Sequence, residues 1–130
     1  MNDNEIKKVS VSIPTYKRSE KLDNILSSIP DHVDVVVSDN GDFTKKWVKD
    51  KHVNVKFFSF EKVVDMFINW NNALNQVESE YFLIPGDDDL YMKNSFSVIQ
   101  KYISQYPDRD IMIFGHNVID NNNNKILKKE

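Results

Sequence analysis

The chain has 130 residues, of which 40% are hydrophobic and 28% are charged, and its net charge is −3. This size and composition predict one globular domain, and the slightly negative charge excludes a global basic field for nucleic acid. The absence of cysteine excludes disulfides, thiolate catalysis and cysteine-based zinc sites.

In chain order, residues 1–7 are polar and lack the apolar core of a signal peptide. No later run approaches the ~20 apolar residues of a membrane span. We therefore expect a flexible tail over residues 1–7 and a single domain over residues 8–130. The expected location is the cytoplasm, including the cytoplasmic face of a membrane.

Strand and helix patterns alternate along this domain. Period-two alternation or short apolar runs predict strands, and apolar stripes at i, i+3, i+4 spacing predict helices. The predicted strands are 9–13, 33–37, 53–58, 81–84 and 111–119, and the predicted helices are 22–29, 43–49, 63–77 and 96–106. In the helix over 63–77, the stripe that should pack inward is Val63, Phe67, Trp70, Leu74 and Val77.

The alternation predicts an α/β fold with a mainly parallel sheet flanked by helices, as in Rossmann-like proteins. The run of four asparagines at 121–124 lies between apolar segments. It predicts a polar turn in a C-terminal β-hairpin.

An acidic run after the fourth strand is the strongest functional signal. The apolar residues 81–84 are followed by Pro85 and Gly86, and then by Asp87, Asp88 and Asp89. Adjacent carboxylates repel one another unless a positive partner compensates, and Mg²⁺ or Mn²⁺ is a natural partner for oxygen ligands. The alternative is an acidic surface turn.

Two further polar segments end strands. Pro14-Thr15-Tyr16 ends the first strand, and Ser38-Asp39-Asn40 ends the second. If the first strand lies between the second and the fourth, all three segments converge on one crevice at the carboxyl ends of the strands. Taken singly, the first segment also suits a strand terminator with a capping hydroxyl, and the second suits an ordinary turn.

These segments together resemble the family 2 glycosyltransferases of the GT-A fold. The first motif is Val11-Ser12-Ile13-Pro14-Thr15-Tyr16-Lys17-Arg18, and the second is Val35-Val36-Val37-Ser38-Asp39-Asn40. The third runs from Glu80 to Leu90 after Asn69-Trp70-Asn71, and resembles the segment that leads into the family's DXD-type metal motif. The resemblance covers residues 8–128, with the three motifs in matching order and spacing.

The resemblance implies site residues for a nucleotide-diphospho-sugar and a divalent metal. Asp39 would bind the nucleobase. The expected nucleotide-binding residues are Pro14, Thr15, Tyr16, Arg18, Glu20, Asp39, Asn69, Asn71, Asp87 and Asp88. The expected ligands of Mn²⁺ or Mg²⁺ are Asp87 and Asp89, and the register within the acidic run stays open. Trp70 lies on the apolar stripe, and we interpret it as a core residue.

The implied reaction is inverting transfer of a sugar, a hexose for instance, from a nucleotide-diphospho-sugar to an acceptor hydroxyl. A UDP-sugar is the favoured donor, and a glycan or lipid-linked acceptor, as in polysaccharide biosynthesis, is the expected partner; no nucleic acid is expected. The family's general base lies in a later acceptor-side segment without a match here. We therefore expect the chain to be the nucleotide-sugar-binding half of a catalytic domain, with little or no turnover by itself and with self-association through an exposed sheet edge.

Two other functions remain open. The same crevice would serve a non-catalytic module that binds a nucleotide-sugar or acts as a scaffold. A sugar nucleotidyltransferase shares the α/β layout but needs a glycine-rich phosphate loop, and the segment after the first strand contains no glycine.

Overall fold

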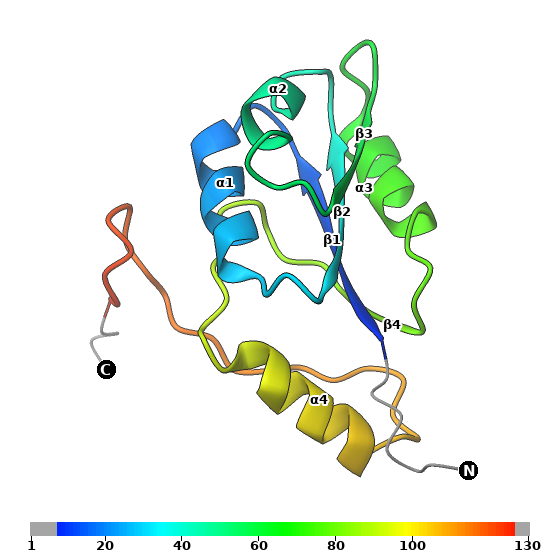
Figure 1. Cartoon of the computed structure of the whole chain (residues 1–130), viewed down its shortest axis with the longest axis vertical. Coiled ribbons are helices and arrows are strands. Elements are labelled where there is room, and N and C mark those ends of the chain that lie inside the picture. Colours follow the sequence, from blue (N-terminus) through cyan, green and yellow to red (C-terminus); the bar gives the residue numbers. More distant parts are fainter. Residues whose placement is uncertain (1–7, 127–130) are drawn as a thin grey trace.

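A computed structural model describes residues 8–126 as a four-stranded parallel sheet with helices on both faces (Figure 1). The strands are β1 (Val9–Thr15), β2 (Asp34–Asp39), β3 (Val55–Ser59) and β4 (Tyr81–Leu83). The helices are α1 (Ser19–Ser28), α2 (Lys45–Val48), α3 (Met66–Asn75) and α4 (Ser95–Gln105). Each element predicted before residue 107 is present, with shifted bounds, whereas the predicted tail over residues 1–7 lies outside the described residues.

The order of the strands is β3-β2-β1-β4. β1 therefore lies between β2 and β4, as the convergence of the three polar segments requires. In the sheet, Thr15 is the partner of Asp39, and Val11 is the partner of Leu83. Because all the pairs are parallel, the carboxyl ends of these strands meet at one edge of the sheet.

The apolar face of the sheet carries the main core. Val11 and Ile13 alternate along β1 and are fully buried, as are Leu22 and Ile25 of α1. Phe96 of α4 belongs to the same cluster. Since each fully buried aliphatic side chain contributes about 1.5–3 kcal/mol, this layer holds α1 and the turn before it against the ends of the strands.

The opposite face of the sheet is polar where α3 packs on it, and the packing of α3 differs from the prediction. The helix exists, but Phe67 is 69% exposed and Trp70 is 39% exposed, so the predicted inward stripe and the core role of Trp70 are wrong. Asn69 and Ala73 face the sheet instead. The reason is hydrogen bonding: the hydroxyl of Ser12 donates to the carbonyl of Ala73 at 2.7 Å, and buried polar groups need such partners.

The segment over residues 111–119 is extended but is no strand of the sheet, so that prediction is also wrong. Met112 and Phe114 pack against a cluster of Val9 from β1 with Ile99 and Ile103 from α4, whereas Ile111 and Ile113 are 82% and 94% exposed. The segment runs along α4 (Figure 1) and pairs with no strand of the four-stranded sheet.

The predicted C-terminal hairpin is present in minimal form. Ile119 and Lys125 form an isolated antiparallel bridge across the asparagine turn. Asp120 accepts hydrogen bonds from the backbone N–H groups of Asn122 and Asn124. Within residues 8–126, no helix has the length and hydrophobicity to cross a bilayer.

Candidate functional site

Thr15 and Asp87 join the ends of β1 and β4. The hydroxyl of Thr15 donates to Asp87 Oδ2 at 2.8 Å, and both residues are buried. The paired part of β4 ends at Leu83, but the chain keeps its position beside β1, so Asp87 reaches Thr15 four residues later. The acidic run therefore begins against the first predicted motif, as the sequence indicated.

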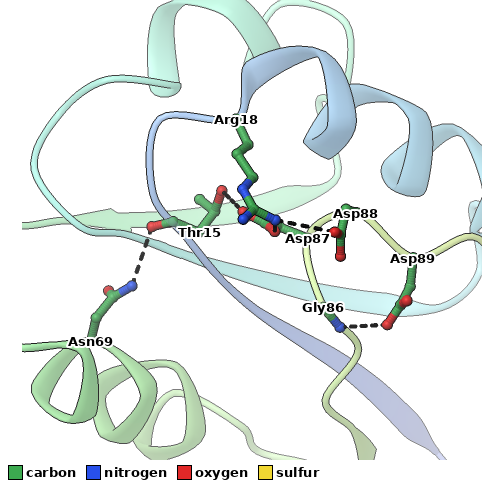
Figure 2. Close-up of polar contacts among 7 residues, drawn as sticks. All are labelled: Thr15, Arg18, Asn69, Gly86, Asp87, Asp88 and Asp89. Atoms are coloured by element: carbon green, nitrogen blue, oxygen red, sulfur yellow. Dashed lines mark hydrogen bonds and ion pairs between the residues drawn. The ribbon is translucent and has the colours of Figure 1, made fainter. Parts of the chain in front are cut away.

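Arg18 is the positive partner of the acidic run in this structure. Its Nη1 lies 3.1 Å from Asp87 Oδ1 and 3.2 Å from Asp88 Oδ2 (Figure 2). The side chains of Arg18 and Asp88 are about half exposed, whereas that of Asp87 is 11% exposed. One guanidinium nitrogen thus bridges two carboxylates, one buried and one facing solvent.

Asp89 has a different environment from its two neighbours. Its Oδ2 accepts a hydrogen bond from the backbone N–H of Gly86 at 2.7 Å, so the carboxylate turns back across the loop (Figure 2). A Cβ added at Gly86 would lie 2.9 Å from Asp88 Oδ1. A larger residue here would make the exposed Asp88 carboxylate shift, and the role of Asp89 as a metal ligand stays a prediction.

Asn69, which was expected to line the donor pocket, ties two strand ends together. It is 3% exposed, accepts from the Ser38 hydroxyl at 2.8 Å, and donates to the carbonyl of Thr15 at 3.3 Å. The alternative candidate, Asn71, is exposed on α3. In this structure, Asn69 therefore holds the ends of β1 and β2 together beside the site.

Asp39, the expected nucleobase ligand, is fully buried at the end of β2. Its Oδ2 accepts hydrogen bonds from the N–H groups of Phe43 and Thr44 and from the Thr44 hydroxyl, while Oδ1 is buried without a partner. Burial raises the pKa of this carboxyl, and the bonds from Thr44 and Phe43 oppose the shift. One acceptor oxygen of Asp39 is thus unused.

The other expected nucleotide-binding residues surround the β1–α1 turn. Pro14 is buried in β1, whereas Tyr16 is 45% exposed and packs edge to face on Phe43 with ring centroids 5.9 Å apart. Lys17 has a φ of 53° and places its ammonium over both rings. Glu20 is exposed in the first turn of α1, beside a shallow depression that Lys17 and Arg18 also line.

Sequence reasoning missed two residues that support this site. Asn40 is 6% exposed, and its side chain both donates to and accepts from the backbone of Val64. Thr44 is fully buried as the partner of Asp39. The Asp-Asn-Gly sequence showed a turn, but these partners lie outside the turn and follow only from the tertiary structure.

The described residues contain no cluster of three carboxylate or histidine side chains that would hold a metal by itself. Mg²⁺ and related ions, however, are bound by one or two carboxylates together with the phosphates of a substrate. Asp87 and Asp88 present two oxygens to one cationic group, the guanidinium of Arg18. The chemistry and placement of these donors therefore fit a divalent ion that arrives with a diphosphate.

The family follows from the sequence match of this whole region. Residues 10–130 match the family described as glycosyl transferase family 2. The chain belongs to this family. A curated relative, an uncharacterized glycosyltransferase of Mycoplasma genitalium, is 26% identical over 123 residues, which cover 84% of this chain and 41% of that protein.

Solved structures agree on the fold. Residues 1–349 of S. aureus TarS match with a TM-score of 0.67 and 27% identity, over 77% of this chain and 33% of that one. PcManGT, a mannosyltransferase of Pyrobaculum calidifontis solved with GDP-Man and Mn²⁺, matches with a TM-score of 0.63 and 17% identity, over 82% and 34%. The fold is therefore GT-A, and the chain spans about a third to two fifths of the length of these relatives.

Proposed function

We propose that this chain binds a nucleotide-diphospho-sugar together with Mn²⁺ or Mg²⁺ and serves an inverting transfer of the sugar to an acceptor hydroxyl. The observation that carries the proposal is the contact of Thr15, Arg18 and Asp87 at the carboxyl ends of β1 and β4 in a family 2 chain. Ligands of open α/β sheets bind at this edge, beside the point where the strand order reverses.

The nucleoside would bind over the ends of β1 and β2. The exposed ring of Tyr16 offers a stacking surface, and the unpartnered Oδ1 of Asp39 is an acceptor for a base N–H. Asp39 is covered in this structure, so residues around Phe43 and Thr44 must shift before a base reaches it. A UDP-sugar is our favoured donor, and GDP-sugars belong in the same test because PcManGT was solved with GDP-Man.

The diphosphate would lie between the β1–α1 turn and the acidic loop. Asp87 would hold the divalent ion with Asp89 or Asp88, and Arg18 supplies a positive charge beside them. The ion, when bound, neutralises charge that develops on the leaving diphosphate. Thr15 keeps the buried carboxylate of Asp87 in position throughout.

Transfer also needs a base within hydrogen-bonding reach of the acceptor hydroxyl. The carboxylates of Asp108 and Asp110 are exposed beyond α4. The segment that contains them lies at the opposite end of the sheet from the site (Figure 1).

We propose a glycan or lipid-linked acceptor, as in polysaccharide biosynthesis, with a hexose as the transferred sugar.

A thermal-shift panel tests the proposal. UDP-, GDP-, CDP- and dTDP-sugars are added to the purified chain with Mn²⁺, with Mg²⁺ and with a chelator. We expect the melting temperature to rise with one base and only in the presence of a divalent ion, because binding to the folded state stabilises it. No shift with any donor in the presence of Mn²⁺ would reject the proposal.

A further inference from the structure

The bridging position of Arg18 carries a further inference, which rests on the proposed function. Its Nη1 lies between Asp87 Oδ1 and Asp88 Oδ2, at 3.1 Å and 3.2 Å (Figure 2). These are carboxylate oxygens of consecutive residues that both face one positive group. A divalent ion bound by the same pair would need the position that the guanidinium nitrogen holds.

The contact of Arg18 can be exchanged at little cost. Both carboxylates share one nitrogen, so the pairing lacks the two parallel hydrogen bonds of a strong arginine–carboxylate pair. The side chains of Arg18 and Asp88 are 54% and 55% exposed, and an ion pair in that setting contributes little net free energy. Asp87 is only 11% exposed, but it keeps its hydrogen bond from Thr15 when the guanidinium leaves. The guanidinium therefore leaves the pair easily when a stronger cation arrives.

Asp87, in contrast, keeps its position without Arg18. Its other oxygen, Oδ2, accepts from the buried hydroxyl of Thr15 at 2.8 Å. This bond comes from β1, which is held by the sheet on both sides. The buried carboxylate thus remains aimed at the same place whether or not the guanidinium is there.

We propose that Arg18 is an internal counter-cation that competes with the divalent ion and moves to the diphosphate of the donor when the ion binds. Without a nucleotide, the ion must displace a positive group that has no other anionic partner among these contacts. With a nucleoside diphosphate bound, the displaced guanidinium gains phosphate oxygens, which suit arginine well. Arg18 therefore couples the binding of the metal to the binding of the nucleotide.

A fixed structural role for Arg18 gives a different expectation. If the guanidinium only held the acidic loop in shape, its removal would weaken metal binding both with and without nucleotide. The coupling between the two ligands is the metal dissociation constant without nucleotide divided by the constant with nucleotide, and this ratio would then stay the same. The two roles are separated by this ratio rather than by either constant alone.

The test measures Mn²⁺ binding by the electron paramagnetic resonance of the free ion, without nucleotide and with saturating UDP, after correction for the Mn²⁺–UDP complex. The variants are Arg18→Gln and Lys101→Gln, a matched control that removes one positive charge from an exposed position on α4. We expect Arg18→Gln to bind Mn²⁺ more tightly without UDP and to lower the ratio of the constants at least ~5-fold. Lys101→Gln should match the wild type.

An unchanged ratio in Arg18→Gln would overturn the proposal while leaving the proposed function intact. If wild type binds neither UDP nor Mn²⁺, the proposed function fails and the inference fails with it. Should Arg18→Gln not fold, the wild type serves: the NMR signal of the Arg18 Nε–H group is followed during titration with Mg²⁺. The signal should shift in proportion to the fraction of the protein that has bound Mg²⁺. A signal that stays unchanged while Mg²⁺ binds would overturn the proposal.

Discussion

The three adjacent carboxylates at the end of β4 differ because each meets a different neighbour. Asp87 is buried on Thr15, Asp88 faces solvent beside Arg18, and Asp89 turns back to Gly86. From the sequence, the run predicted a charged strand end that needs a cation. The direction of each side chain was not predictable, because it depends on how the loop folds over Gly86 and on the register beside β1.

Asp89→Asn separates the predicted ligand role from the observed loop contact. Asparagine still accepts a hydrogen bond from the Gly86 N–H but carries no charge, so the fold should remain intact. We expect the variant to lose most of the Mn²⁺-dependent UDP binding, measured by calorimetry. Asp88→Asn is the matched comparison, and unchanged Mn²⁺-dependent binding in Asp89→Asn would remove this residue from the metal site.

Asp39→Ala tests the recognition of the base. If a base N–H bonds to this carboxylate, its removal should weaken UDP binding by about 1–3 kcal/mol, because a charge-assisted hydrogen bond is lost. Asp39→Asn is the control, since it keeps an acceptor for the N–H groups of Phe43 and Thr44. A crystal soaked with UDP that places the base far from Asp39 would contradict the assignment.

At the scale of elements, the periodic patterns predicted the strands and helices well, and failed where pairing or polar contacts decide. For α3, the stripe with Phe67 and Trp70 suggested a buried face, yet the sheet face beneath the helix presents Ser12 and Ser38. Their hydroxyl groups need partners, and Asn69 supplies one of them. The residues over 111–119 show the other limit, because alternation predicts which side chains face inward but does not supply a neighbouring strand.

One contact between elements was not predicted from the sequence. Asp23 on α1 lies 2.7 Å from His52 Nε2 and 3.5 Å from Lys51 Nζ, in the loop between α2 and β3. The hydrogen bond with His52, followed by the charges of Lys51 and His52, lowers the pKa of Asp23 below its usual 3.8, and burial opposes the shift. The histidine thus ties α1 to the loop after α2.

Asp23→Asn should therefore reduce the free energy of unfolding, by about 0.5–1 kcal/mol near neutral pH, since the pair is partly solvated. An acid whose pKa is lower in the folded state stabilises the protein above its unfolded pKa. That stability is lost as the pH falls below 3.8 and through the lower folded value. Urea denaturation from pH 7 to pH 3 measures the difference, and a difference that does not decrease as the pH falls toward 3 would contradict this account.

At the scale of the whole molecule, the fold and the meeting of three strand ends were predictable because strand alternation limits the topology. The family match confirms the predicted family. What could not be predicted is how the site is filled from within, by Arg18 between the carboxylates and by Thr44 on Asp39. Arg18 lies far from its carboxylate partners along the sequence, and Thr44 lies outside the recognised motifs.

The last prediction concerns turnover by the 130 residues alone. Catalysis needs a base at the acceptor hydroxyl and a wall that keeps water from the donor sugar. We expect none of the later carboxylates among the described residues to supply the base, because the segment with Asp108 and Asp110 lies at the end of the sheet opposite the site (Figure 1) and Asp120 accepts backbone hydrogen bonds in the hairpin turn. We therefore expect weak donor binding with little or no sugar transfer.

The measurement is release of UDP from the donor, with and without candidate glycan or lipid-linked acceptors, beside calorimetry of donor binding. Binding without acceptor-dependent release is the expected outcome, and it would also suit a non-catalytic binding module. Sedimentation at several concentrations tests self-association, which we expect because β3 and β4 are edge strands of the described sheet. Robust acceptor-dependent turnover would contradict the prediction, and Asp108→Asn, Asp110→Asn and Asp120→Asn would then identify the base.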